Sequence, residues 1–313
     1  MIRTVLVGLG QVGAGYDFEN CNYKRSHLGA MLLQKNIKII RLIDKNKRKF
    51  NKIKKFYSKI PLSFSDSISK IDQTKIDLCV IATTTGNHEQ VIRDIVKYQP
   101  KLIICEKPLT YFPDKEKKIL DYIIKEKIKL FINYHRKFDS RFKQLSQKLK
   151  ENEFNKLIFK YGKGFLNNAS HMLEFLIRTS GKVKNFKIIR KKKFGKDFLI
   201  DLCIEFNSGL IAYFISFDKY KFDMFDMEFY SKNRKIEILN GGFEINQYST
   251  KKNLIYKNYS SLKLLKKTNK PFGNGFEKLY ENVSKYFNEK KHELDSSMDD
   301  YYYLSSIIKK ILS

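Results

Sequence analysis

The sequence predicts an α/β protein of two domains: a doubly wound parallel sheet, followed by an α+β domain with an open, largely antiparallel sheet. Strand-like and helix-like segments alternate over roughly the first 130 residues, as in a parallel sheet with crossover helices. Residues 183–256 are instead mostly strand-like, and 313 residues are too many for one ordinary core. We expect domains at residues 1–132 and 133–313, with C-terminal helices that can return to the first domain.

In the first domain, the expected strands are short and almost wholly apolar, which fits burial on both faces of a parallel sheet. The last expected helix carries Ile119, Leu120, Ile123 and Ile124 at the spacing of one helical face. The expected strands are 4–10, 37–44, 76–83, 101–107 and 128–134. The expected helices are 27–35, 45–57, 66–71, 87–98 and 114–127.

In the second domain, helices frame a run of strands that turn signals divide into hairpins. The sequences Asn-Ser-Gly at 207–209 and Asn-Gly-Gly at 240–242 are typical of hairpin turns. The expected strands are 156–162, 185–191, 198–206, 210–217, 225–231 and 234–239. The expected helices are 140–151, 170–181, 276–287 and 299–312.

The net charge of +29 raises the question of a nucleic-acid partner. Of the 62 basic residues, 52 are lysine, and they are spread along the chain with Ile, Asn, Tyr and Phe, all residues with A/T-rich codons. A nucleic-acid surface usually clusters Arg and Lys, often with stacking aromatics. We therefore expect no nucleic-acid partner. The densest basic stretches, 45–55 and 190–193, are expected to be a solvated helix face and a loop.

Apolar runs, cysteines and the N-terminus favour a cytoplasmic protein without a membrane partner. No apolar run approaches the roughly 18 residues that span a bilayer, and the chain enters a strand directly after Met1, without a signal peptide. The four cysteines show no metal spacing, and two of them lie in expected buried strands, which suits reduced thiols. No metal site is expected.

A glycine motif directly follows the first expected strand. Gly8, Gly10 and Gly13, with Gln11 and Val12 between them, form the G-x-G-x-x-G fingerprint of a Rossmann dinucleotide site, although such a turn also occurs without a cofactor.

Asp44 ends the second expected strand, later than the usual spacing, and an extended loop at 14–27 accounts for the difference. Its carboxylate would accept hydrogen bonds from ribose hydroxyls and repel a 2′-phosphate, which favours NAD. Lys45, Lys47 and Arg48 keep NADP open.

A second polar stretch follows the third expected strand. Thr83 and Thr84 would donate hydrogen bonds to a dinucleotide that passes close to the chain, and His88 either touches the cofactor or is structural. Alternatively, Thr85 or Asn87 simply caps the following helix. Both interpretations are compatible.

Together these residues resemble the glucose–fructose oxidoreductase/inositol dehydrogenase/MocA (Gfo/Idh/MocA) family. Residues 164–176 resemble its histidine-bearing helix, residues 292–312 its closing segment, and residues 13–30 a branch of sugar-modifying enzymes of surface-polysaccharide pathways. Five matches in chain order carry the resemblance: VGLGQVG (7–13), Asp44, IATTTGNH (81–88), CEKPLT (105–110) and NYHRKFD (133–139).

The resemblance implies roles for Glu106 and Lys107. Lys107 would lie at the nicotinamide and polarise the oxygen being oxidised or reduced, Glu106 would orient it or meet the cofactor, and the Lys107–Pro108 bond would often be cis. Without the other motifs, Glu106 and Lys107 would be an ordinary surface pair at a strand end.

The resemblance also implies that His171 moves the proton, since a histidine titrates near neutral pH. Glu174, one helical turn on, would orient it or cap a charge there. Many relatives carry aspartate where this chain has Asn167, followed by Asn168. Asparagine can hydrogen-bond a hydroxyl but cannot act as a base. Either Lys107 and His171 carry the proton transfers, or alcohol dehydrogenation is altered or lost.

Residues after the fifth expected strand complete the expected substrate site. Tyr134 and Arg136 would line the pocket together with the two asparagines. The implied function is an NAD(P)-dependent oxidoreductase that acts on a sugar, a sugar derivative (nucleotide-linked or amino sugars included) or a cyclitol. The alternatives are a non-redox elimination or hydrolysis with internally recycled NAD, and a non-catalytic cofactor-binding regulator of the same fold.

A homodimer or homotetramer is expected through the second sheet. Residues 198–206 and 210–217 are apolar on both alternating faces, so one face needs a cover beyond the domain's own helices.

Overall fold

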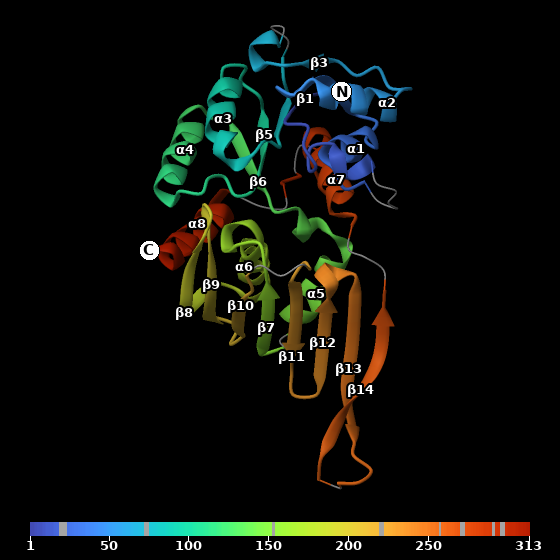
Figure 1. Ribbon diagram of the computed structural model, residues 1–313, viewed down its shortest axis with the longest axis vertical. Coiled ribbons are helices and arrows are strands. Elements are labelled where there is room, and N and C mark those ends of the chain that lie inside the picture. Colours follow the sequence, from blue (N-terminus) through green and yellow to red (C-terminus); the bar gives the residue numbers. More distant parts are fainter. Residues whose placement is uncertain are drawn as a thin grey trace. The chain divides into compact units, whose positions relative to one another are not determined.

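The computed structural model in Figure 1 describes residues 1–18, 24–71, 75–151, 154–218, 222–256, 258–269, 273–289, 292–294 and 298–313. It contains two compact units: residues 1–139 with 273–306, and residues 140–272 with 307–313. The division at 132/133 remains a prediction about separately folding domains.

The first unit contains a six-stranded parallel sheet in the order β3-β2-β1-β4-β5-β6. This order reverses between β1 and β4, where doubly wound sheets bind ligands at the carboxyl ends of their strands. The sequence-predicted fold class is confirmed for this unit. The strands are β1 (Ile2–Val7), β2 (Ile37–Ile43), β3 (Phe64–Ser65), β4 (Leu78–Ile81), β5 (Leu102–Glu106) and β6 (Lys129–Asn133).

Helices cover both faces of this sheet: Figure 1 shows α3 and α4 on one side of β5 and β6, and α1 and α7 on the other. Helix α7, from the C-terminal part of the chain, contacts α1. The α-helices of the first unit are α1 (His27–Leu32), α2 (Arg48–Phe56), α3 (His88–Val96), α4 (Pro113–Lys125) and α7 (Gly275–Asn288). Helix α8 (Met298–Leu312) begins in the first unit and ends in the second. The 3₁₀-helices are η1 (Gly15–Phe18), η2 (Ile68–Lys70), η3 (Thr85–Asn87) and η4 (His135–Phe138).

The second unit contains an eight-stranded sheet in the order β14-β13-β12-β11-β7-β10-β9-β8, antiparallel except between β7 and β10. The open, largely antiparallel sheet is therefore confirmed. Its strands are β7 (Lys156–Tyr161), β8 (Val183–Phe194), β9 (Asp197–Phe206), β10 (Ile211–Ser216), β11 (Phe225–Tyr230), β12 (Arg234–Leu239), β13 (Glu244–Lys252) and β14 (Ser260–Thr268). Its helices are α5 (Ser140–Lys150), the π-helix η5 (Phe165–Ala169), α6 (Ser170–Ser180) and the 3₁₀-helix η6 (Asn240–Gly242).

One edge of this sheet corrects an expectation: residues 190–193 were expected to be a loop, and this is wrong, because they lie within β8. Asp201 on β9 pairs with Arg190 Nε at 2.8 Å, and Asp218 pairs with Lys192 Nζ at 2.7 Å. Like-charged neighbours in sequence are thus neutralised by acids from other strand segments, which a local pattern of charges does not reveal.

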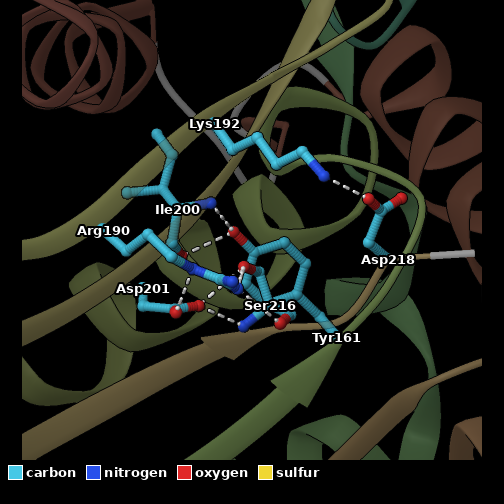
Figure 2. Close-up of polar contacts among 7 residues, drawn as sticks. All are labelled: Tyr161, Arg190, Lys192, Ile200, Asp201, Ser216 and Asp218. Carbon is cyan, nitrogen blue, oxygen red and sulfur yellow. Dashed lines mark hydrogen bonds and ion pairs between the residues drawn. The ribbon is translucent and has the colours of Figure 1, made fainter.

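On the side that faces β9, the end of β10 is held by side chains instead of backbone pairs, as Figure 2 shows. The Tyr161 hydroxyl donates to the Ile200 carbonyl at 2.8 Å and accepts from the Ile200 N–H at 2.9 Å. The Asp201 carboxylate accepts the Ser216 N–H and hydroxyl, both at 2.6 Å, and Arg190 donates to the Ser216 carbonyl at 3.2 Å. This cluster connects β7, β8 and β9 across the end of β10.

The outward face of β10 carries partly exposed apolar side chains, Ile211, Tyr213 and Ile215, whereas Ala212 and Phe214 between them are buried. Such a face would suit a second subunit, and the expected homodimer or homotetramer stays a prediction.

Replacement of Tyr161 by Phe should lower the free energy of unfolding by about 1–3 kcal/mol, because both Ile200 backbone groups lose their hydroxyl partner inside the protein. Urea unfolding measures this change. Tyr213→Phe is the matched control, since this ring is 39% exposed, and it should stay within about 0.5 kcal/mol of wild type. Equal effects of the two variants would contradict the structural role of the Tyr161 hydroxyl.

Candidate functional site

The glycine turn after β1 is packed against the neighbouring strand. Gly8 has φ +96°, and a Cβ there would lie 2.5 Å from the Ala82 carbonyl carbon. A Cβ at Gly13 would overlap the Gly8 carbonyl oxygen. At Gly10 a Cβ would meet nothing within 4 Å. Gly8 and Gly13 are therefore required by the fold itself, whereas the open space at Gly10 leaves room for a ligand.

The residues after the turn do not enter a long helix directly. Gln11 accepts the Tyr16 N–H through its carbonyl, and Val12 accepts the His27 N–H in the same way, at 2.9 and 3.0 Å. The expected extended loop thus returns to the turn before α1 begins. Residues 19–23 of this loop lie outside the described residues.

A buried carboxylate, Asp17, closes this loop. It accepts the Arg25 N–H at 2.7 Å and the Ser26 hydroxyl, and Tyr57 donates to it at 3.3 Å.

Asp44 follows β2 and faces the glycine turn. Its carboxylate accepts the Leu9 N–H at 2.8 Å, the Asn46 N–H at 2.8 Å and the Lys49 ammonium at 2.6 Å. Burial opposes ionisation of Asp44, but these donors outweigh it and lower its pKa below the ordinary value. Asp44 is therefore an anion next to the turn, and Lys49, which sequence reasoning did not single out, is its cationic neighbour.

The polar residues directly after β4 differ in their hydrogen bonds. The buried Thr83 hydroxyl has no hydrogen-bond partner within the described part of the chain. Thr84 accepts a hydrogen bond from the Asn87 side chain at 3.0 Å, and Asn87 caps α3 without a side-chain bond to it. The capping role considered for Asn87 is therefore not seen as a side-chain contact.

His88 is fully buried between two loops. Its Nε2 lies 3.1 Å from the Thr83 carbonyl, and its Nδ1 lies 3.0 Å from the Pro108 carbonyl. Burial lowers the pKa of His88, so the ring is neutral. These contacts hold the loop after β4 against the loop after β5, which supports the structural alternative for this residue.

The Glu106-Lys107-Pro108 motif stands at the carboxyl end of β5. Glu106 is the last residue of the strand, and the Lys107–Pro108 bond is cis, as the family resemblance implies. Glu106 accepts hydrogen bonds from His27 Nε2 at 2.9 Å and from Asn133 Nδ2 at 2.6 Å. Burial opposes its ionisation, but His27 and its other donors lower the pKa of Glu106 to about 2.

Tyr134 lies directly after β6, and Arg136 lies in η4. Tyr134 is buried. Burial lowers the pKa of Arg136 to about 10, so it stays charged near neutral pH. Next to them, burial lowers the pKa of His135 to about 3, and its ring stacks on Phe276 of α7 at 4.6 Å between ring centroids.

The second unit holds Asn167, Asn168 and His171 where a π-turn leads into α6. Asp197 accepts the Leu166 and Asn167 N–H groups at 2.9 and 3.0 Å, which anchors this turn. Gly164, with φ +91°, begins it, and a Cβ there would overlap the Asp197 carboxylate.

The polar side chains of this turn have different environments. Asn167 is exposed and donates to the Lys163 carbonyl at 3.2 Å, whereas Asn168 is half-buried and donates to the Gly162 carbonyl at 3.1 Å. His171 is buried on α6. Glu174, expected to orient His171 or cap a charge, lies 3.6 Å from Arg178 Nε.

Comparison with known proteins identifies the first unit. A protein-family model described as an oxidoreductase family with an NAD-binding Rossmann fold, GFO/IDH/MocA, matches residues 2–134. The N-terminal part of the chain, residues 2–134, therefore matches the NAD-binding Rossmann domain of the Gfo/Idh/MocA family. No curated protein sequence matches.

Solved structures share the fold over nearly the whole chain. A dehydrogenase from Chromobacterium violaceum is 15% identical with a TM-score of 0.73 and covers 99% of this chain and 94% of its own. UDP-N-acetylglucosamine 3-dehydrogenase from Acidithiobacillus ferrooxidans is 11% identical, TM-score 0.70, over 99% and 96%. A super-repressor mutant of Gal80p from Saccharomyces cerevisiae is 12% identical, TM-score 0.73, over 99% and 95%.

The residues present fit the NAD that this family's domain binds. The space at Gly10, the unpaired Thr83 hydroxyl and the Asp44 anion lie after β1, β4 and β2, at the carboxyl edge of the sheet where dinucleotides bind. Within the described ranges, no group of three or more His, Cys, Asp or Glu side chains could hold a metal, and no helix is long and apolar enough to cross a membrane.

Gly10→Ala should weaken NAD+ binding by at least about tenfold without changing stability, because its Cβ enters the space that a dinucleotide needs and touches no protein atom. Isothermal titration calorimetry and thermal unfolding measure the two quantities. Gly162→Ala, where a Cβ makes only ordinary contacts, is the control and should change neither. Normal NAD+ affinity in Gly10→Ala would place the cofactor elsewhere.

Glu106 should support stability in mild acid. Its pKa is lower in the folded protein than the ordinary 4.5, so its contribution is present above about pH 4.5 and is lost as the pH falls towards about 2. Urea unfolding between about pH 5 and pH 3 should therefore show a smaller loss of stability in Glu106→Gln than in wild type.

Glu116→Gln is the control of opposite sign. Burial raises the pKa of Glu116 despite hydrogen bonds from Tyr301 and Ser305, so its contribution is lost as the pH rises above the ordinary value. If wild type and Glu106→Gln lost stability equally in acid, the Glu106 carboxylate would not be held as an anion.

Proposed function

We propose that this protein is an NAD(P)-dependent oxidoreductase that transfers hydride between nicotinamide and a carbinol carbon of a sugar, a sugar derivative or a cyclitol. The observation that carries the proposal is the Glu106-Lys107-Pro108 motif at the end of β5 in an NAD-binding domain of this family. The fold shared with a UDP-N-acetylglucosamine dehydrogenase supports a nucleotide-linked or amino sugar as substrate.

The roles that we assign to the chain follow from its chemistry. The bound nicotinamide supplies the hydride acceptor or donor. Lys107 hydrogen-bonds the substrate oxygen and favours the charge that develops on it, and His171 takes or returns the hydroxyl proton. Asn167 and Asn168 offer amide hydrogen bonds to hydroxyl groups but no base. Tyr134 and Arg136 belong to the proposed substrate contacts.

NAD is the proposed cofactor, with NADP as the alternative. The Asp44 anion favours a ribose with a free 2′-hydroxyl, because it would repel a 2′-phosphate. Its partner Lys49 is the cation that could attract one instead, if it left Asp44.

Two other functions fit the same fold. In an internally recycling enzyme, the bound NAD would be reduced and reoxidised during an elimination or hydrolysis, so that added NAD is not consumed. In a regulator, NAD would bind without turnover, and the similarity in fold to Gal80p favours this candidate. The exposed Asn167 in place of a base is compatible with both.

Replacement of Lys107 by Ala should lower kcat/KM for hydride transfer by at least about 100-fold and leave NAD+ affinity within about threefold, because the lysine acts on the substrate oxygen. The assay follows NADH absorbance with a panel of sugars, sugar nucleotides and cyclitols. Lys101→Ala, at the start of the same strand segment and paired with Asp77 at 3.0 Å, is the control.

The state of the purified protein separates the alternatives. Exchangeable NAD that turns over only with Lys107 present supports the proposal. Tightly held NAD without net turnover would contradict it in favour of the recycling enzyme or the regulator. A wild-type protein that binds no dinucleotide would refute all three.

A further inference from the structure

A buried hydrogen-bonded chain reaches the Glu106-Lys107-Pro108 motif from the C-terminal part of the sequence. The Tyr280 hydroxyl on α7 lies 2.7 Å from His27 Nδ1, and His27 Nε2 lies 2.9 Å from Glu106 Oε1. Tyr280 and His27 have no exposed surface. These three side chains come from α7, α1 and β5, so the contact joins segments 253 positions apart.

The two oxygens of Glu106 have different partners. Asn133, paired with Glu106 in the register of β5 and β6, donates to Oε1 as His27 does. Oε2 has no hydrogen-bond partner among the residues that the structure describes, and the Glu106 side chain is still 10% exposed. A carboxylate accepts about four hydrogen bonds. His27 and Asn133 therefore occupy Oε1, and Oε2 can accept a hydrogen bond from a further donor.

Hydrogen-bond satisfaction fixes the protons along the chain. An ionised Glu106 has no proton to donate, so His27 Nε2 must carry the hydrogen between them. If Nδ1 carried one too, the buried Tyr280 O–H would have no acceptor among the described residues, at the cost of a buried unpaired donor. Neutral His27 with hydrogen on Nε2 lets Tyr280 donate to Nδ1. Every side-chain donor among Tyr280, His27 and Glu106 is then paired.

Aromatic rings and uncharged titratable groups surround the three side chains. The Phe276 ring lies against His27 at 4.9 Å and stacks on His135 at 4.6 Å between centroids. The titratable groups that act on Glu106 from the adjacent elements are His27, His88, His135, Tyr280 and Cys105. Burial keeps His88, His135, Tyr280 and the Cys105 thiol in their uncharged forms.

We infer that Tyr280 and His27 are positioning residues that fix the Glu106 carboxylate as an oriented anion, with Oε1 held by the protein and Oε2 directed to the cofactor. The inference rests on the proposed function, which puts the nicotinamide beside Lys107. Oxidised nicotinamide carries a positive ring charge that the reduced form lacks. An anion at this place therefore stabilises bound NAD+ relative to bound NADH.

The proton positions can be tested without any cofactor, by ¹⁵N NMR of the histidine-labelled protein. The chain has five histidines, and His27→Gln identifies the His27 signals. We expect His27 to be neutral with hydrogen on Nε2, and Tyr280→Phe to shift its Nδ1 signal. Tyr286→Phe, on the same helix and outside the chain, should not, since its ring packs under the Lys129 ammonium at 4.7 Å. Hydrogen on His27 Nδ1 in wild type would overturn the inference.

The effect on the cofactor is tested by the ratio of the dissociation constants for NAD+ and NADH. Glu106→Gln should weaken NAD+ relative to NADH by about tenfold, the scale of one partly buried charge contact. His27→Leu and Tyr280→Phe should change the ratio in the same direction by about threefold, His27→Gln should restore it by supplying an N–H, and Tyr286→Phe should leave it unchanged.

The outcomes separate this inference from the proposed function. Variants at His27 and Tyr280 that lower thermal stability but leave the ratio unchanged would show a merely structural role and overturn the inference, while hydride transfer by wild type would still support the proposed function. A wild-type protein that binds neither NAD+ nor NADH would overturn both.

Discussion

The buried carboxylate of Glu106 is the constraint on which the first unit depends. A buried charge is costly unless its hydrogen bonds are satisfied, so its partners must come together for the unit to fold. They come from α1 and β6, and α7 holds the α1 partner in turn. Glu106 is also the last residue of β5, and Lys107 of the motif follows it directly. The Glu106 carboxylate therefore affects both the stability of the first unit and the position of the proposed catalytic lysine.

The second unit also uses carboxylates and a hydroxyl to hold backbone groups that regular structure leaves unpaired. Where the pairing of β9 with β10 ends, Tyr161 of β7 bonds the backbone of β9, and Asp201 of β9 and Arg190 of β8 bond the backbone of Ser216 on β10 (Figure 2). Asp197 does the same for the turn that carries the two asparagines, because its carboxylate accepts two consecutive N–H groups. In both places a polar side chain replaces a backbone hydrogen bond that regular secondary structure would supply. This holds the irregular backbone before the proposed substrate residues in place.

Local patterns were enough to predict the fold class, the positions of most strands along the sequence and the motif residues, because these depend on apolar periodicity and on short fingerprints. The strands β3, β13 and β14 were not predicted. β3 has two residues, β13 is rich in polar residues, and β14 is exposed along nearly all its length and rich in lysine. The partners His27, Asn133 and Tyr280 were also missed. Their roles follow from strand register and from contacts across 253 positions, and only Ser26-His27 before α1 offered a local signal.

Tyr280 and Phe276 belong to the first unit but follow residues 140–272 of the second unit, so a ribosome makes them after that segment. While the second unit emerges, the nascent first unit holds His27 and Glu106 without the helix that covers them. The hydrogen-bonded series Tyr280–His27–Glu106 can be completed only after residue 280 has been synthesised. A chain cut short before α7 would thus keep the glycine turn and Asp44 but lack the Tyr280 hydroxyl that contacts His27.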